Sequence, residues 1–540
     1  MTALAAEGAK PGAPPRLSLS MDRVEPPEPT LGLWLAFLAM VFGNFMAILD
    51  IQIVASSITQ IQAGVSASRD EITWVQTSYL IAEVIAIPLS GFLIRALGTR
   101  LLFTTAACGF AIMSMLCALS WDMNSLILFR TLQGFIGGAL IPTTMSTLYL
   151  MFPSHRQAVA GTMVGLVSTM APSIGPTLGG WLSEFAGWRW LFWVNVIPGF
   201  VIAVMVWRLL PSPKPNWSMI RNLDVWGLVG LAAMLGCAQF VLEEGPGHDW
   251  FSEPSVMIGA IAAVAGAALF FTRSLTHRNP IVDLRVFQFG NFAVGCGLAL
   301  LVGVGLYTPI FLQPLFLGQV RGYNALEIGH TMFAQGAAMF VMAPLMSRLG
   351  QTIDDPRPLA AFGFSLIALS CYMQSHLTAE SAFWDFTLPQ MIRGVGMMIC
   401  FMSIMRPTLA SLPQALVPSG TGVFNLMRNL GGAFGLAILT TLQQHALALH
   451  RQELYAAADT PAARAAIEAN AARLAAEGVA QPETVALAMH VQLLDREALV
   501  MTFNDQFLTL AIALALAGAA TMLMKKPAPV APAAQPVDAH

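Results

Sequence analysis

Long uncharged stretches of about twenty residues recur along the chain from Leu33 almost to Met524, a length and composition typical of helices that cross a lipid bilayer. Polar and Gly- or Pro-containing breaks separate these stretches. The pattern predicts an all-α polytopic membrane protein with 14 transmembrane helices. Their expected ranges are 33–58, 72–94, 101–119, 124–148, 157–181, 190–210, 224–242, 255–274, 291–317, 327–349, 358–375, 384–409, 418–442 and 501–524.

Lysine and arginine fall mainly on one side of these helices. If the N-terminus is cytoplasmic, sixteen basic residues lie in the tails and short connections on that side, and three lie in short connections on the other. An excess of basic residues marks the cytoplasmic side of a membrane protein. Because the predicted number of helices is even, both termini are expected in the cytoplasm.

Three short segments are echoed in the same order at a nearly constant offset. LQGFIGG (132–138) is echoed by IRGVGMM (392–398), GTMV (161–164) by GTGV (420–423), and GFLIRALG (91–98) by APLMSRLG (343–350). Parallel six-helix repeats are a secondary-transporter architecture, with the substrate site between the halves near the membrane midplane.

The repeats predict the domain organisation. Two six-helix bundles, 33–210 and 287–524, flank an inserted helix pair, 211–286. Low-complexity cytoplasmic tails are expected at 1–32 and 525–540, and a long outer loop at 443–500. The connection 243–254 within the inserted pair is acidic and is expected to carry no chemistry.

Composition narrows the functional classes. Only 11% of the residues are charged and the formal net charge is −3, so nothing indicates a nucleic-acid partner. The six cysteines lie in apolar stretches without metal-ligand or disulfide spacing. The sequence contains no nucleophile motif, metal-binding cluster or phosphate-binding loop. An enzyme and an ATP-driven pump are therefore disfavoured, and no metal or other cofactor is expected.

Ionisable residues inside the spans are the main candidates for function, because a charge in hydrocarbon needs a partner or a water-filled cavity. Asp50, Glu83 and Arg130 lie in the first, second and fourth predicted spans. Counted along their helices, all three lie roughly 9–16 Å from the outer ends and can share one depth. We predict that Asp50 and Glu83 couple proton entry to substrate exit, with Arg130 biasing their ionisation. A static Asp50–Arg130 pair, or recognition of a cationic substrate by Glu83, are the alternatives.

Neutral polar residues and one arginine are candidates for substrate contacts. Gln76, Tyr79 and Glu83 share a helical face by their spacing, as do Asn425 and Arg428. The arginine favours anionic or amphipathic substrates, with pairing to backbone carbonyls as the alternative. The predicted substrate-binding residues are Gln52, Gln76, Tyr79, Gln313, His330, Gln335, Asn425 and Arg428.

Four segments carry a family resemblance: LILFRTLQGFIGGA (126–139), APSIGPTLGGWL (171–182), WRWLFWVNVIPG (188–199) and LPQALVPSGTGVFNLMRNLGGAFG (412–435). In these segments the chain resembles the Major Facilitator Superfamily, specifically its fourteen-helix drug:proton antiporter branch, with EmrB-like pumps most similar. Glycine and proline in membrane helices permit close contact and bending. The predicted gating and helix-packing residues are Gly91, Gly98, Gly134, Gly175, Pro176, Gly179 and Gly180.

The resemblance implies a proton-coupled antiporter that exports hydrophobic or amphipathic toxic compounds by alternating access between the bundles. It implies the bacterial inner membrane as the location and the proton gradient as the energy source, with no cofactor. EmrB-like pumps work with a periplasmic adaptor and an outer-membrane channel, so loop 443–500 is a candidate adaptor contact or, alternatively, a solvated cap. Export of one endogenous metabolite, fatty acid or siderophore is a second interpretation. A membrane sensor is a third.

Overall fold

All of the secondary structure that the structure describes is helical. The computed structural model describes residues 26–211, 215–277, 279–352, 355–458 and 460–524. The predictions for most of the N-terminal tail and for 525–540 lie outside these residues. Within them, each of the fourteen predicted spans is occupied by helix, and no strand occurs.

The first bundle contains six long helical segments, with two short helices connecting the first pair. They are α1 (Leu31–Ser56), α2 (Ile58–Val65), α3 (Arg69–Ile72), α4 (Trp74–Leu97), α5 (Thr99–Ala118), α6 (Met123–Gly137) with α7 (Leu140–Met151), α8 (Ser154–Phe185), and α9 (Trp190–Trp193) with α10 (Val196–Leu209). Four of the predicted spans include a break between helices. The break falls near one end of 33–58 (between α1 and α2) and of 72–94 (between α3 and α4), and it falls inside 124–148 (between α6 and α7) and 190–210 (between α9 and α10).

The inserted pair and the second bundle follow. The inserted pair contains α11 (Trp217–Arg221), α12 (Val225–Glu244) and α13 (Pro254–Thr276), with the 3₁₀ turns η1 (Gly245–His248) and η2 (Trp250–Ser252) between the last two. The turn η3 (Leu284–Gln288) leads into the second bundle. That bundle contains α14 (Gly290–Gln319), α15 (Ala325–Thr352), α16 (Pro356–Gln374), α17 (Phe383–Ala410), η4 (Gln414–Leu416), α18 (Val417–Ala458), α19 (Pro461–Ala476), α20 (Pro482–Ala520) and η5 (Thr521–Leu523).

Eleven of the helical segments are long and apolar enough to cross a membrane. The count becomes twelve when α8 is included, which bends by 47° between Ser154–Pro172 and Ile174–Phe185. Pro172 and Pro176 lie inside α8, and proline removes a helical hydrogen bond and favours such a bend. The less apolar α15 and α16 fall outside this set, so the count of fourteen spans stays a prediction.

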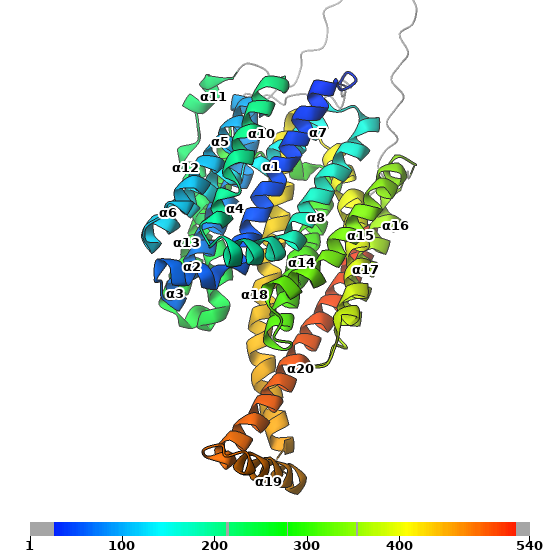
Figure 1. Ribbon diagram of the computed structural model, residues 1–540. Coiled ribbons are helices and arrows are strands. Elements are labelled where there is room, and N and C mark those ends of the chain that lie inside the picture. The colour runs from blue at the N-terminus through cyan, green and yellow to red at the C-terminus, as the bar shows by residue number, and fades with distance from the viewer. Residues whose placement is uncertain (1–25, 212–214, 278, 353–354, 459, 525–540) are drawn as a thin grey trace, which may run out of the picture.

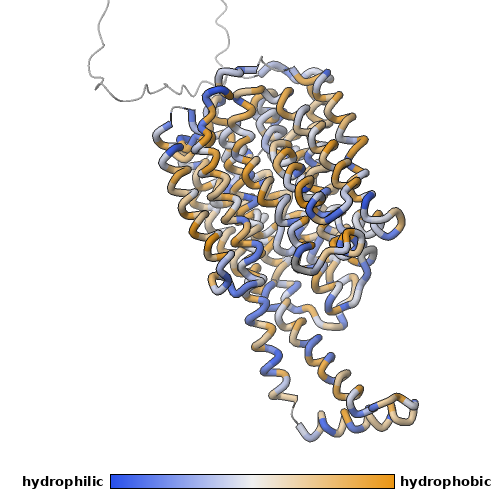
Figure 2. The backbone as a smooth tube through the Cα atoms, turned by 90° about the vertical axis from the view of Figure 1, so that its left-hand side faces the viewer, coloured by the Kyte–Doolittle hydropathy of each residue, from blue (hydrophilic) through white to orange (hydrophobic). Residues whose placement is uncertain are grey.

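The region predicted as the outer loop 443–500 is almost entirely helical. The helices α18 and α20 extend well beyond the apolar bundle, and α19 joins their ends (Figure 1). We call α19 and the adjoining ends of α18 and α20 the protrusion. Figure 2 shows its mixed hydropathy against the largely apolar surface of the bundle. The region is helical although it was predicted as a loop. Its many alanines and its regularly spaced charges favour a helix even without a hydrophobic environment.

The two bundles pack against each other through a few helices. In the second bundle α15 packs on α8, and α18 packs on α4 and α7. The inserted helix α12 packs on α13 and also on α4 and α18, so it touches both bundles. At the end of the molecule opposite the protrusion, the bundles meet closely: the Ser146 and Thr421 hydroxyls are 2.6 Å apart.

Candidate functional site

An ion pair lies at the centre of the first bundle. Asp50 of α1 accepts a hydrogen bond from Arg130 of α6, with Oδ2 and Nη1 2.5 Å apart. Both side chains are completely buried. A charge in an apolar interior is costly unless it is paired and hydrogen-bonded, so each of these residues satisfies the requirement of the other. The shared depth predicted for Asp50 and Arg130 thus corresponds to a direct contact.

Three further polar residues complete this cluster. Asn195 Nδ2 donates to Asp50 Oδ1 at 2.6 Å, and Gln133 Nε2 donates to the same oxygen at 3.4 Å. Gln133 also accepts from Arg130 Nη1 at 2.8 Å and donates to Ser114 Oγ at 2.6 Å. Sequence patterns predict no role for Asn195, Gln133 or Ser114. We call Asp50, Arg130, Gln133, Asn195 and Ser114 the acidic cluster.

Helix α4 closes the acidic cluster on a further side. Arg130 Nε donates to the Val75 carbonyl at 3.3 Å, and the guanidinium lies 4.2 Å from the centroid of the Tyr79 ring. Such a stack adds a cation–π attraction to the ion pair. Since α1, α4, α5, α6 and the start of α10 all contribute, a change at Asp50 would be felt by most of the first bundle.

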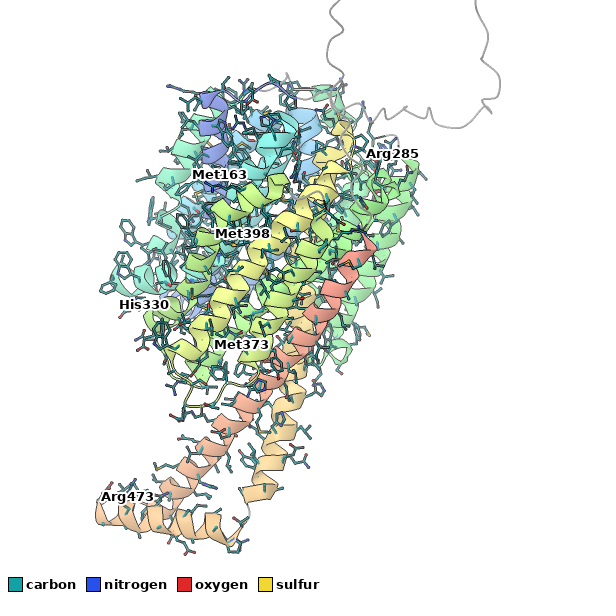
Figure 3. The ribbon with its side chains drawn as sticks, turned by 90° about the vertical axis from the view of Figure 1, so that its right-hand side faces the viewer. Met163, Arg285, His330, Met373, Met398 and Arg473 are labelled. Atoms are coloured by element: carbon teal, nitrogen blue, oxygen red, sulfur yellow. The ribbon has the colours of Figure 1, made fainter. Side chains whose placement is uncertain are left out.

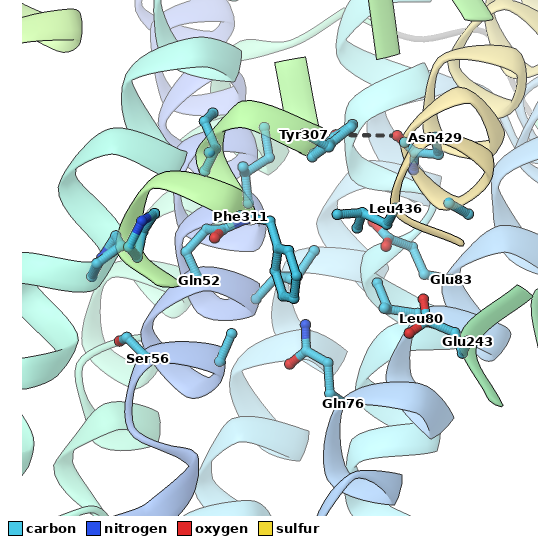
Figure 4. A pocket seen from close by; sticks show the side chains of 18 of the residues that line it. Gln52, Ser56, Gln76, Leu80, Glu83, Glu243, Tyr307, Phe311, Asn429 and Leu436 are labelled. Carbon is cyan, nitrogen blue, oxygen red and sulfur yellow. Dashed lines mark hydrogen bonds between the residues drawn. The ribbon is translucent and has the colours of Figure 1, made fainter. Parts of the chain in front are cut away.

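A cavity of about 410 Å³ lies between the two bundles. This volume is within the range of roughly 300–1,000 Å³ typical of small-molecule sites. The cavity is lined mainly by α1, α4, α12, α14 and α18 (Figure 4). The lining residues of α1 and α14 lie toward the ends of these helices that are nearer the protrusion. Most lining side chains are apolar, and Phe311 projects into the space. The apolar lining suits a hydrophobic or amphipathic molecule.

The polar groups of the cavity are distributed unevenly. Six come from α1, α4 and α12, and two come from α14 and α18. The former are Gln52, Ser56, Gln76, Glu83, Gln239 and Glu243, and the latter are Tyr307 and Asn429. The Tyr307 hydroxyl donates to Asn429 Oδ1 at 3.3 Å. Both carboxylates therefore lie on one side of the cavity.

Glu83 is separate from the acidic cluster. It lines the cavity and, among the described residues, makes no ion pair with Arg130. Its largest charge–charge interaction is with Arg428 of α18, across the boundary between the bundles. No guanidinium nitrogen of Arg428 has a hydrogen-bond partner of normal geometry in the described part of the chain, although Tyr307 lies beside it. Glu83 and Arg428 therefore influence each other across the bundles without forming an ion pair among the described residues.

The inserted helix α12 contributes to the cavity wall, which differs from the prediction for residues 243–254. The helix continues to Glu244, beyond the expected end at 242, and the extra turn carries Glu243 into the cavity lining. Gln239, one turn earlier, lies on the same face and donates to Glu243 Oε1 at 2.9 Å. The predicted helix ended before Glu243 and Glu244, because two adjacent charged residues are typical of a loop.

The second bundle has a buried cluster of its own around Arg393 of α17. Gln335 Oε1 accepts from Arg393 Nε at 2.8 Å and from Nη2 at 2.6 Å. Gln313 Oε1 accepts from Nη2 at 3.3 Å and from Gln374 Nε2 at 3.2 Å. No carboxylate pairs with Arg393 in the described residues. We call Arg393, Gln335, Gln313 and Gln374 the amide cluster.

The structure therefore separates the predicted substrate-binding residues. Gln52 and Gln76 line the cavity, whereas Tyr79 packs on Arg130 and Gln313 and Gln335 belong to the amide cluster. Asn425 is buried and donates to the Thr421 carbonyl at 2.8 Å and to Met145 Sδ at 3.1 Å. His330 is exposed on the surface of α15 (Figure 3).

Four of the seven predicted gating and helix-packing residues lie at close helix contacts. A side chain at Gly134 would collide with the Tyr79 carbonyl, one at Gly175 with Gln52, and one at Gly179 with Ser56. A side chain at Gly91 would meet the Pro418 carbonyl across the bundles. The remaining three residues serve other local purposes. Gly98 has a left-handed φ of +80° between α4 and α5, Pro176 lines the cavity, and Gly180 accepts from Ser183 Oγ at 3.1 Å.

Metal chemistry has no obvious site in the described residues. No group of three or more His, Cys, Asp or Glu side chains is arranged to hold a metal ion there. The chemistry that the geometry can support is proton exchange at carboxylates and binding of an amphipathic molecule in the cavity.

The sequence matches the model of the Major Facilitator Superfamily over residues 40–436. It is 44% identical to the colistin resistance protein EmrB of Acinetobacter baumannii over 422 residues, which cover 78% of this chain and 82% of that protein. It is 31% identical to the multidrug export protein EmrB of Escherichia coli K12 over 418 residues, 77% of this chain and 81% of that protein.

Two other similarities widen the comparison. The chain is 30% identical to the fatty acid resistance protein FarB of Neisseria gonorrhoeae over 485 residues, 89% of this chain and 94% of that protein. The structure of the human organic anion transporter MFSD10 matches with a TM-score of 0.55 at 12% identity, covering 90% of this chain and all of that one. At this identity the similarity concerns the fold alone.

Proposed function

The chain is a multi-pass drug-efflux transporter of the Major Facilitator Superfamily, and we propose that it is a proton-coupled antiporter of amphipathic compounds in the bacterial inner membrane. The observation that carries this proposal is the fully buried Asp50–Arg130 pair. Asp50 lies on α1, a helix that also lines the cavity, and the cavity contains a second acid, Glu83. Ionisable residues within a membrane protein often mark ion or substrate pathways, because a charge in the hydrocarbon region is costly and is rarely kept without a function.

In the proposed mechanism, the distance between Asp50 and Arg130 changes during the transport cycle. While the pair is intact, the Asp50 charge is compensated. If movement of α1 relative to α6 lengthens the contact, the carboxylate in an apolar interior takes up a proton instead. Because α1 and α4 also line the cavity, such a movement would change the substrate site. Proton binding and substrate release would thereby be linked.

We infer the state of the proposed transport cycle mainly from the position of the cavity. The bundles touch at the end opposite the protrusion, where Asn425 and Ser146 bridge α18 and α7, and they also pack closely at Gly329 of α15, where a side chain would collide with Thr177 of α8. The cavity lies nearer the protrusion. With the predicted topology, the protrusion is periplasmic and the cytoplasmic side is closed. This is the state from which an exporter would release its substrate.

The experiment compares Asp50→Asn with the wild-type protein in vesicles. A pH gradient should drive substrate movement by the wild-type protein, and substrate should displace protons from the purified protein. Asn keeps the shape and the neutral hydrogen bonds of a protonated aspartate but cannot exchange a proton. We expect both signals to disappear in Asp50→Asn, while thermal unfolding in detergent shows that the protein is folded. Unchanged proton-driven transport by Asp50→Asn would reject the mechanism.

We also propose that the protrusion contacts a periplasmic adaptor, which links the transporter to an outer-membrane channel. The protrusion is a defined shape: Arg451 Nε and Asp495 Oδ1 lie 2.9 Å apart between α18 and α20, and Ala471, Leu474 and Ala486 form a small core. Photo-crosslinkers at exposed positions of α19 should capture the adaptor, and the same probes on exposed positions of α13 should not. Equal capture by both helices would contradict an adaptor contact.

A further inference from the structure

The inserted helix pair is attached to both bundles beside the cavity. Phe240 of α12 stacks on Trp74 of α4, with ring centroids 5.9 Å apart and planes inclined by 24°. The loop after α12 is tied to α18 by a hydrogen bond of 3.0 Å from Trp250 Nε1 to Thr441 Oγ1. The inserted pair is therefore a fixed part of the cavity wall in this state.

Glu243 presents a carboxylate without a cation. Its hydrogen bond comes from the neutral amide of Gln239, and no ion pair includes Glu243 in the part of the chain that the structure describes. The adjacent Glu244 adds a second negative charge, and its Oε2 lies 3.8 Å from Nδ1 of the exposed His248. An uncompensated carboxylate next to an apolar cavity either takes up a proton or is stabilised by a positive group in that cavity.

Glu83 and Glu243 line the same cavity from neighbouring helices (Figure 4). Gln76 and Gln239 add amide oxygens to this side, whereas Phe311 and Leu436 offer apolar surface. A molecule with an apolar body and a positive group can satisfy both parts of the lining. An anionic amphiphile would instead face two carboxylates.

We propose that Glu243 is a specificity-determining residue, which the inserted pair supplies to the cavity in order to select lipophilic cations. This inference rests on the proposed function, since it names the substrate class of the same cavity. Glu243 makes the ionic contact with the positive group of the substrate, and the second carboxylate, Glu83, extends the selection to compounds with two positive centres. Asp50 remains the coupling residue and does not contact the substrate.

Binding to the purified full-length protein in detergent tests the inference without a proton gradient. The probes are tetraphenylphosphonium as a monocation, dequalinium as a dication, and a neutral apolar dye of similar size. Glu243→Gln preserves side-chain volume and a hydrogen bond to Gln239 but removes the charge. We expect roughly tenfold weaker binding of both cations and unchanged binding of the neutral dye, because a tenfold change is within the range of one desolvated ionic contact.

Glu244→Gln is the matched control, since it removes an equal charge from the next position, outside the cavity lining. We expect wild-type binding of all three probes by this variant. Glu243→Lys should reject the cations more strongly than Glu243→Gln. Equal weakening of the neutral dye in Glu243→Gln would assign the residue a structural role and overturn the inference, as would cation binding that does not change.

The outcome is distinguishable from a failure of the proposed function. If Asp50→Asn transported normally but Glu243→Gln lost only cation binding, the coupling mechanism would fail and the selectivity would stand. If Asp50→Asn lost coupling and Glu243→Gln bound cations normally, the coupling would stand and the selectivity would fail.

Discussion

The two bundles each bury an arginine on corresponding helices but provide it with different partners. Arg130 of α6 pairs with the carboxylate of Asp50, and Arg393 of α17 is held by the neutral amides of Gln335 and Gln313. Both guanidinium groups are fully buried. Gly134, four residues after Arg130, and Gly394, directly after Arg393, both press against a carbonyl of the neighbouring helix. The two repeats therefore share the close packing at the glycine, but the partner of the buried arginine is charged only in the first bundle.

This difference indicates which bundle is suited to the proposed proton exchange. A carboxylate can exist with or without a proton, and its preference follows the distance to its cation. An amide has only one state under the same conditions. The acidic cluster can therefore exist in two protonation states, whereas the amide cluster can only hold its helices together. In the proposed mechanism, the second bundle serves as the partner against which the first bundle moves.

Removing the two arginines should have unequal consequences. Arg130→Leu leaves the buried Asp50 carboxylate with hydrogen bonds but no cation, which typically costs about 3–5 kcal/mol. Arg393→Leu removes a costly buried charge and leaves only neutral acceptors, so we expect a loss of at most about 1–2 kcal/mol. Thermal unfolding in detergent would measure both effects.

The double variant Asp50→Asn with Arg130→Leu is the control for this comparison. Because it removes both charges, it should recover much of the stability lost in Arg130→Leu, and the recovery measures the interaction between the two residues. Equal destabilisation by Arg130→Leu and Arg393→Leu would show that the partner charge is unimportant, and the proposed division between the bundles would be wrong.

Sequence patterns predicted much of this comparison. Hydropathy located the helices, because each must span an apolar layer. The repeat aligned Gly134 with Gly394, and the depth estimate brought Asp50 near Arg130. These features depend on position along a single helix or on one internal offset. Linear patterns contain that information directly.

The contributions of other helices could not be predicted in the same way. Asn195, at the start of α10, donates to Asp50, and Ser114 of α5 accepts in turn from Asn195 at 3.4 Å. No periodicity links residues so far apart in the chain. Tyr79 shares a face with Gln76 and Glu83 by spacing, but it lies roughly 60° around the helix from Gln76 and meets Arg130 instead of the cavity. Rotation of a helix about its axis is fixed by its neighbours.

A second comparison should show that packing is equivalent in the two bundles. Gly134→Ala would place a methyl group against the Tyr79 carbonyl, and Gly394→Ala would place one 2.5 Å from the Gln335 carbonyl. Backbone atoms cannot move aside easily, so each change should cost about 1–3 kcal/mol. Measured melting temperatures in detergent should fall by similar amounts.

Gly297 on α14 provides the control for both substitutions. It is exposed, and a methyl group there would meet no atom within 4 Å. Gly297→Ala should therefore be neutral or slightly stabilising, since alanine favours the helix. A tolerated Gly394→Ala beside a damaging Gly134→Ala would mean that the bundles differ in packing as well as in charge.

The smallest expected effect concerns the helix starts at the protrusion side of each bundle. Ser68 and Glu71 cap α3 reciprocally: Ser68 Oγ accepts from the Glu71 amide at 3.2 Å, and Glu71 Oε2 accepts from the Ser68 amide at 2.9 Å. Asn324 and Glu327 make the same exchange before α15, with both distances 2.9 Å. Both bundles thus have the same reciprocal helix cap.

The cap of the first bundle should respond to pH. Hydrogen bonds from the Ser68 amide and hydroxyl lower the pKa of Glu71 below its ordinary value. A lowered pKa in the folded state means that the stabilisation is present above the ordinary glutamate pKa and is lost as the pH falls through the lowered value. Hydrogen exchange of the α3 amides, corrected for intrinsic rates, should accelerate over that interval. Ser68→Ala should already exchange roughly fivefold faster at neutral pH, the size expected for one lost N-cap, and should respond less to acid. If the acid response of Ser68→Ala matched that of the wild-type protein, the Glu71 cap would not be its cause, and the resemblance of the two caps would be one of geometry alone.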